Sequence, residues 1–283
     1  MIMKMIYLHA FLAVTVVLGL PLNAKETKPE SKSEPYVAPS VRIDPNGFGA
    51  SKRDITKLLD SVTVELWKHF PGYKLEPIVI THHKNGPIVL YRRNAKNEIV
   101  VRLACQKNYW SQYSYQWAHE FCHILHGFRD EPSQNKWFEE TLAELASIYT
   151  LRAMSESWKT NPPYPNWKSY GASLKKYAQN VINTREKIDL KSLAGYYKKH
   201  RAKLVKNETL RDLNGAMAVA ILPLFEKNPT NWESIRYLNV SPTTKNMNFN
   251  AYLTKWYHDA PKKHHAFIIE LSGYFGEKIK TKK

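Results

Sequence analysis

Cysteines and acidic residues are both scarce in this sequence. Its 283 residues include only 2 cysteines, and 25 Asp and Glu residues stand against 42 Lys and Arg residues. Two cysteines, Cys105 and Cys122, allow at most one disulfide bridge. The shortage of acids leaves a formal net charge of +17, which attracts polyanions. No nucleic-acid-binding motif accompanies the basic residues, so they predict a solvated basic surface, with an anionic surface polymer as the alternative partner.

Long apolar runs are also missing, apart from one near the N-terminus. The run from Met5 to Leu20 has 16 residues, fewer than the roughly 20 that a membrane-spanning helix needs. It follows Lys4 and ends shortly before Ala24, a pattern typical of a secretory signal peptide. We therefore expect residues 1–24 to be a signal peptide cleaved after Ala24, rather than a retained anchor. The mature protein should have no transmembrane segment and should be secreted or periplasmic.

Composition also predicts the domain organisation. Residues 25–45 begin with a stretch of Lys, Glu, Ser, Thr and Pro that has little to bury, and they predict a flexible linker, with order beginning near Val41. Residues 46–283 show no internal repeat and are numerous enough for one domain with a sizeable core. We expect two lobes within it, at about 46–127 and 128–283.

The apolar pattern indicates a mixed lobe followed by a helical one. Residues 51–70 have helical spacing, and strands are expected at 75–81, 88–92 and 98–104, the last two joined by a hairpin turn. Beyond Ser157 the pattern is nearly all helical, and Pro223 should end or kink a helix there. The fold class is therefore expected to be α+β. Strand 99–103 is either an exposed edge strand or an ordinary core strand.

The most informative segment is His119-Glu120-Phe121-Cys122-His123. Two histidines four apart on a helix turn the same way, about 40° apart around the axis, and can bind one metal ion. Glu120 lies on the neighbouring stripe and can act as a base on a water molecule. His126 should be too far from His119, about 10.5 Å along the helix, to share that ion. Cys122 lies off the ligand stripe, and a Cys105–Cys122 bridge would brace this helix against the sheet.

A catalytic zinc ion usually has three protein ligands and one open position. Gly127 should end the first helix, and the apolar pattern after Asn135 predicts a second helix that packs back against it. Glu140 then lies at the height of His123, so it is the expected third ligand, with Glu144 as the alternative. With Glu140 as ligand, Glu144 should accept the outer ring N–H of His119 and Glu139 should face solvent.

These residues resemble the gluzincin metallopeptidases, in which a His-Glu-x-x-His helix precedes a helix that carries a Glu ligand. Residues 137–144 are similar to the Trp-Leu-x-Glu-Gly-x-Ala segment of the aminopeptidase N-like group. The resemblance implies a zincin-like fold with the site between the lobes, one catalytic Zn²⁺ held by His119, His123 and Glu140, and Glu120 as general base. It also implies a tyrosine or histidine that stabilises the oxyanion. The competing residues are Tyr196, Tyr197, Tyr237, Tyr252, Tyr257 and His258.

The expected activity is that of a secreted or periplasmic zinc-dependent peptidase acting on peptides or proteins. The Gly-Ala-Met-Glu-Asn segment that binds a free α-amine in the aminopeptidase group does not precede His119, which favours an endopeptidase. The alternative is a catalytically inactive zincin-fold binding module for an anionic envelope component or a partner protein. A third possibility applies the same zinc chemistry to a non-protein amide such as a cell-wall crosslink.

Overall fold

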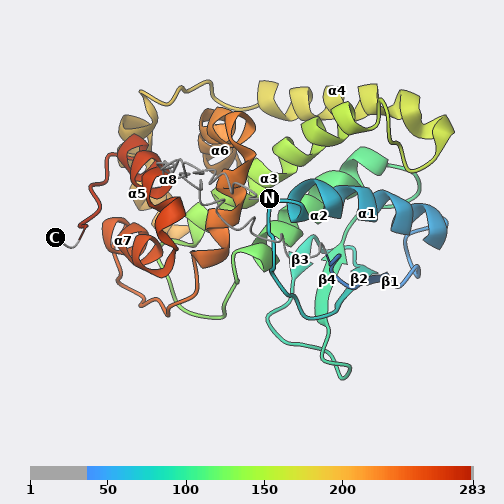
Figure 1. The fold of residues 1–283 in the computed structure, drawn as a ribbon, viewed down its shortest axis with the longest axis horizontal. Coiled ribbons are helices and arrows are strands. Elements are labelled where there is room, and N and C mark those ends of the chain that lie inside the picture. Colours follow the sequence, from blue (N-terminus) through green and yellow to red (C-terminus); the bar gives the residue numbers. More distant parts are fainter. Residues whose placement is uncertain (1–36, 282–283) are drawn as a thin grey trace, which may run out of the picture. The chain divides into compact units, whose positions relative to one another are not determined.

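The computed structural model describes residues 37–281 and shows a mixed α+β fold (Figure 1). The expected signal peptide and most of the expected linker lie outside the described residues. Among those residues, none of the helices combines the length and apolar character that crossing a membrane requires.

The fold begins with a four-stranded sheet and two helices. The strands are β1 (Val41–Ile43), β2 (Ile78–His82), β3 (Ile88–Val89) and β4 (Ile99–Leu103), in the spatial order β1-β2-β4-β3. Helix α1 (Lys52–Trp67) precedes β2, and α2 (Trp110–Leu125) follows β4. β1 lies within residues 25–45, the segment expected to be a linker. Its residues are ordered because Val41 pairs with Ile78 in a parallel ladder.

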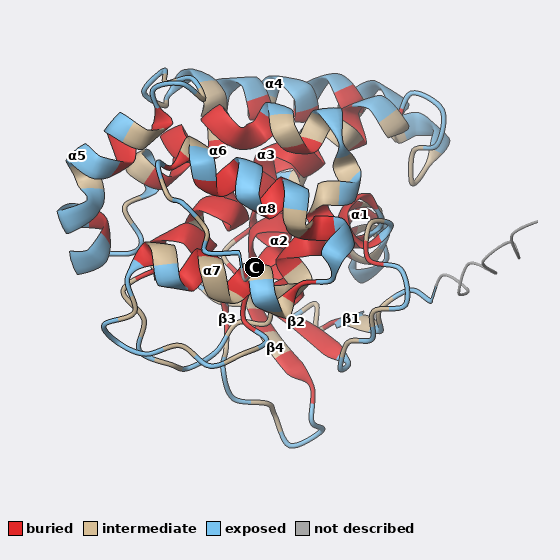
Figure 2. Cartoon of the chain, turned by 60° about the vertical axis from the view of Figure 1, so that its left-hand side comes forward, coloured by how far each residue is buried: buried red, intermediate tan, exposed pale blue. Residues whose placement is uncertain are grey.

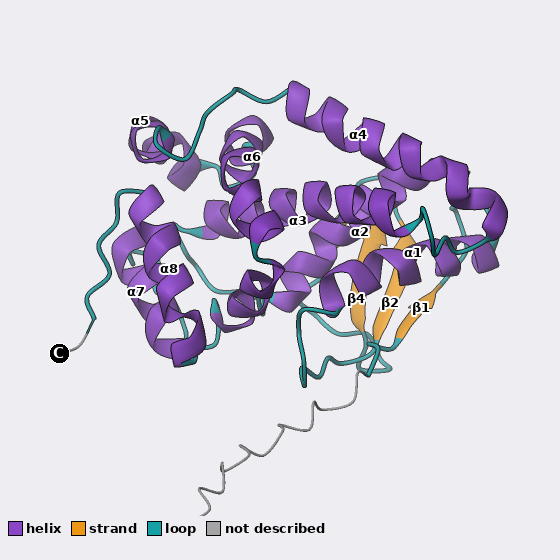
Figure 3. Ribbon diagram, turned by 45° about the horizontal axis from the view of Figure 1, so that its top comes forward, coloured by secondary structure: helices purple, strands orange, loops and turns teal. Residues whose placement is uncertain are grey.

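The strand order decides between the two alternatives left open for strand 99–103. β4 pairs in parallel with β2 on one side and antiparallel with β3 on the other, so it is a core strand rather than an edge strand. Its residues alternate between buried and half-buried, with Ile99, Val101 and Leu103 fully inside. The edges of the sheet are β1 and β3, and Figure 3 shows β1, β2 and β4 lying beneath α1 and α2.

The rest of the described chain is helical. It contains α3 (Lys136–Ser157), α4 (Gly171–Asn183), α5 (Leu193–Lys206), α6 (Arg211–Lys227), α7 (Phe249–Asp259) and α8 (Lys262–Tyr274), with 3-10 helices at Pro165–Tyr170 and Pro229–Tyr237. Pro223 lies inside α6, which continues to Lys227, so of the two alternatives expected at this proline, a helix end or a kink, the helix end is wrong. One continuous apolar core joins the sheet to these helices.

α3 is the central helix, since α1, α2, α4, α5 and α6 all contact it. α2 and α3 are buried along most of their length, as Figure 2 shows. Ser147 donates to the carbonyl of Tyr115, and Cys122 donates to that of Leu142, so the two helices run antiparallel. α2 thus lies between the sheet and α3, and its polar side chains face groups that α3 supplies.

Both cysteines are free and buried, so the Cys105–Cys122 bridge that the sequence left open does not form. The thiol of Cys105 donates to Oε1 of Gln116 at 3.0 Å. Burial raises the pKa of both thiols. The two side chains therefore serve as core residues beside α2.

Candidate metal centre

Helix geometry brings the two histidines of the motif together. His119 and His123 lie one turn apart on α2, with ring centroids 5.0 Å apart and only 7% and 9% of their surface exposed. α2 ends at Leu125, two residues beyond His123, and Gly127 adopts a left-handed conformation with φ of +71°. The helix end expected at this glycine is confirmed.

Glu140 of α3 faces both histidines across the antiparallel pair. Its Oε2 lies 3.3 Å from Nε2 of His119, and its Oε1 lies 3.5 Å from Nε2 of His123. Two ligands that are each about 2.0–2.1 Å from a tetrahedral ion lie about 3.4 Å apart. Both nitrogen–oxygen distances are close to this spacing, and the donor atoms of the three side chains all lie within 4.8 Å of one another, so the group could hold one metal ion.

Burial and neighbouring charges shift the pKa values of the three side chains in different directions. Burial would lower the pKa of His119, but its hydrogen bond to Glu140 and the charges of Glu120, Glu140 and Glu144 raise it to about 9. Burial would raise the pKa of Glu140, but His123 and His119 lower it to about 2. The pKa of His123 falls to about 4, mainly through burial. The carboxylates create a negative potential that a proton or a metal ion can offset.

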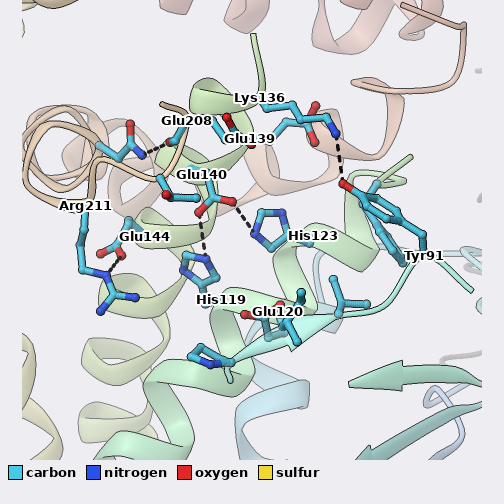
Figure 4. A pocket seen from close by; sticks show the side chains of 16 residues that line it. Tyr91, His119, Glu120, His123, Lys136, Glu139, Glu140, Glu144, Glu208 and Arg211 are labelled. Carbon is cyan, nitrogen blue, oxygen red and sulfur yellow. Dashed lines mark hydrogen bonds and ion pairs between the residues drawn. The ribbon is translucent and has the colours of Figure 1, made fainter. Parts of the chain in front are cut away.

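Glu120 is buried beside the ligand set, with 3% of its surface exposed. Burial raises the pKa of Glu120 to about 7, while the charge of His119 and the backbone N–H of Val89 oppose this rise. Figure 4 shows its side chain beside the two histidines. A carboxyl group in this position can exchange a proton with a molecule in the cleft.

These residues line a cleft of about 280 Å³. The lining comes from β3, α2, α3, the start of α6 and the loops beside them. It comprises Pro87, Ile88, Val89, Tyr91, His119, Glu120, His123, Phe128, Lys136, Glu139, Glu140, Glu144, Glu208, Thr209, Arg211 and Asn214. Tyr91 and Lys136 form one wall, where Nζ of Lys136 donates to the tyrosine hydroxyl at 3.1 Å. Glu208 and Arg211 lie opposite (Figure 4).

The structure corrects the expected role of Glu144. The Nδ1 atom of His119 has no hydrogen-bond partner among the described residues, so the expected contact with Glu144 is absent. Glu144 instead accepts a short hydrogen bond from Tyr115 and lies 3.2 Å from Nε of Arg211 and 3.6 Å from Nη2 of Arg185. The two arginines come from outside the α2–α3 pair, and they draw the carboxylate away from His119.

Replacing Glu144 by glutamine should destabilise the fold and leave zinc binding intact. The variant leaves Arg185, whose side chain is 9% exposed, with Asp212 as its only acidic partner among the described residues. Breaking a buried ion pair from one side costs roughly 3 kcal/mol. Urea unfolding would measure this loss of stability, and a zinc titration of the same sample would measure the affinity. Lost zinc affinity at unchanged stability would instead indicate that Glu144 supports His119 directly.

Two further expectations fail at this centre. Glu139 does not face solvent: it is 9% exposed, and it accepts a hydrogen bond from Tyr252 of α7. None of the tyrosines or histidines expected to compete for the oxyanion lines the cleft. Tyr91, Lys136 and Arg211 occupy it instead, and nothing in their local sequence marks them, because segments far apart in the chain bring them together.

No family model, no curated protein and no solved structure matches the chain.

Proposed function

We propose that the protein is a zinc-dependent peptidase of the gluzincin type with a zincin-like fold. The observation that carries the proposal is the arrangement of His119, His123 and Glu140, whose donor atoms all lie within 4.8 Å of one another and line a cleft. The buried carboxyl group of Glu120 lines the same cleft. Two nitrogen ligands, one oxygen ligand and a neighbouring base are what metal-assisted hydrolysis requires.

The chemistry divides between the metal and Glu120. Zinc bound at the three donors would supply Lewis acidity, which polarises a peptide carbonyl and makes water nucleophilic near neutral pH. Glu120 would take the proton of the attacking water and deliver it to the leaving amine. Its burial in the cleft wall keeps the carboxyl group in one position for both transfers.

The edge strand β3 suits an extended peptide substrate. Ile88 and Val89 pair with Arg102 and Val101 of β4, and the N–H of Leu90 donates to the carbonyl of Val100. Val89 therefore occupies a non-hydrogen-bonded position of the antiparallel ladder, and its own N–H and C=O point away from β4. Because Val89 also lines the cleft, its C=O can pair with a substrate main chain, whereas its N–H donates to the carboxyl group of Glu120.

The two walls of the cleft supply donors for the carbonyl oxygen of the substrate. Arg211, at the start of α6, and Lys136, at the start of α3, both line the cleft, and Tyr91 adds a hydroxyl group. A cationic or hydroxyl donor stabilises the negative charge that develops on that oxygen during attack. We favour endopeptidase action because no amine-binding segment resembling that of the aminopeptidases precedes α2.

The direct test is hydrolysis of a mixed peptide library by the purified mature protein. We expect cleavage within peptides, complete loss of activity with 1,10-phenanthroline and recovery on adding stoichiometric zinc. Purified cell-wall fragments in parallel reactions would detect action on a non-protein amide. A protein that contains no zinc and leaves every peptide intact would overturn the proposal and favour a binding module.

A further inference from the structure

A buried chain of hydrogen bonds leads away from His123 on the side opposite Glu140. Nδ1 of His123 lies 3.1 Å from Nε2 of His126, the residue that caps the C-terminus of α2. His126 is completely buried, and its Nδ1 lies 3.3 Å from Nδ2 of Asn239. Each imidazole thus has a polar partner at both of its nitrogens.

The chain ends at a carboxylate. The hydroxyl of Tyr252 lies 2.9 Å from Oδ1 of Asn239 and 3.3 Å from Oε1 of Glu139. The other oxygen of Glu139 lies 3.8 Å from Nδ1 of His126. Asn239, Glu139 and Tyr252 are 6%, 9% and 0% exposed, so water does not compete freely for these bonds.

The direction of the bonds depends on what His123 binds. The amide of Asn239 presents Nδ2, a donor, to Nδ1 of His126. His126 then carries its proton on Nε2 and donates it to Nδ1 of His123, which leaves the His123 proton on Nε2, 3.5 Å from Glu140. This direction satisfies the metal-free site, because the Nε2 proton faces a carboxylate.

A metal ion bound to Nε2 of His123 requires the opposite direction of these hydrogen bonds. To bind zinc through Nε2, neutral His123 must carry its proton on Nδ1. Nε2 of His126 must then accept a hydrogen bond from this Nδ1–H group. His126 then carries its own proton on Nδ1 and needs an acceptor there. A half turn of the Asn239 amide places Oδ1 at this position.

The same half turn of the amide also gives hydrogen-bond partners to Nδ2 of Asn239 and to the hydroxyl of Tyr252. Nδ2 of Asn239 would then donate to the oxygen of Tyr252, and the Tyr252 hydroxyl would donate to Oε1 of Glu139, which lies 3.3 Å away. The bonds between His123 and His126, between His126 and Asn239, and between Asn239 and Tyr252 are retained with donor and acceptor exchanged, and Tyr252 remains the donor to Glu139. The negative carboxylate at the far end of the chain balances part of the charge that the metal places on His123.

We propose that His126, Asn239, Tyr252 and Glu139 form a reversible hydrogen-bond relay that sets the tautomer of His123, with the Asn239 amide turning over when the metal binds. His126 is a positioning residue in this relay. The inference rests on the proposed function, because it takes His123 as a zinc ligand. It gives a role to a histidine and a carboxylate that the hydrolytic chemistry leaves unused.

Histidine tautomers can be read directly in the unaltered protein. Long-range ¹H–¹⁵N correlation spectra of ¹⁵N-histidine-labelled protein show which ring nitrogen carries the proton. We expect His126 to be protonated on Nε2 after chelation and on Nδ1 in the zinc-loaded protein. An unchanged tautomer with one zinc bound would overturn the relay and leave the proposed peptidase intact, whereas a wild-type protein that binds no zinc would remove both. Two zinc ions per chain would indicate an ion between His123 and His126 and would also overturn the relay.

Two variants test the contribution of the relay to metal affinity. H126F should raise the zinc Kd about 10–100-fold in a competition assay with a chromogenic chelator, which is the usual cost of losing an outer-shell partner. Y252F should raise it less, because only the last hydrogen bonds are lost. The matched control is Y113F, since the hydroxyl of Tyr113 is buried and has no partner among the described residues. A wild-type Kd for both H126F and Y252F would contradict the proposal.

Discussion

Replacing Glu120 by glutamine should abolish peptide hydrolysis and leave zinc bound. The amide keeps the size of the side chain but cannot accept the proton of the attacking water. Loss of a general base typically lowers the rate about 10²–10⁴-fold. Glu120 is not one of the three ligands, so we expect zinc content to remain at one ion per chain by atomic absorption.

The control for this variant is E208Q. Glu208 also lines the cleft but belongs neither to the ligand set nor to the relay, so its amide variant should cleave near the wild-type rate. Wild-type turnover in E120Q would show that another group acts as base. Loss of zinc in E120Q would show instead that Glu120 is a ligand.

Replacing Glu140 by alanine should empty the metal site. Its two oxygens lie opposite the two histidines, and two imidazoles alone leave the ion short of the usual three protein ligands. The fall in affinity should exceed the roughly 10–100-fold that loss of an outer-shell partner costs. Zinc stoichiometry after gel filtration and the activity of the same sample should therefore fall together.

E156A provides the matched control for E140A. Glu156 lies on the same helix, α3, but is exposed and pairs only with Lys159 among the described residues. It should retain both zinc and activity. Full zinc occupancy in E140A would assign the third position to another group, with Glu144 as the first alternative, since it also lines the cleft.

The parts of the candidate centre that sequence could predict are those fixed by local geometry. His119 and His123 lie together because a helix repeats every 3.6 residues. Glu140 could be placed because a short connection after Gly127 leads into an antiparallel partner helix. These inferences need only helix period, a helix end and a loop length.

The parts that sequence could not predict depend on distant segments. Glu144 looked free to contact His119, but Arg211 comes from α6 and engages it. Glu139 looked exposed, but Tyr252 and Asn239 come from beyond α6 and bury it. Contacts between segments so far apart in the chain cannot be predicted from a local sequence pattern.

In the sheet, too, local features could be predicted from the sequence and long-range pairing could not. The hairpin between the second and third expected strands follows from turn chemistry, and β3 and β4 do pair antiparallel. Which of the two lies at the edge depends on β2, which pairs with β4 rather than β3. A pairing between strands separated by a hairpin leaves no signal in either strand alone.

The antiparallel packing of α2 against α3 has a thermodynamic consequence. The backbones that carry all three donors are held by one apolar core, so they need little ordering when an ion arrives. Zinc would then stabilise a fold that already exists, by mass action and in proportion to the logarithm of its free concentration. Metal exchange and global unfolding would then be separate events, and chelation would remove the metal without unfolding the protein.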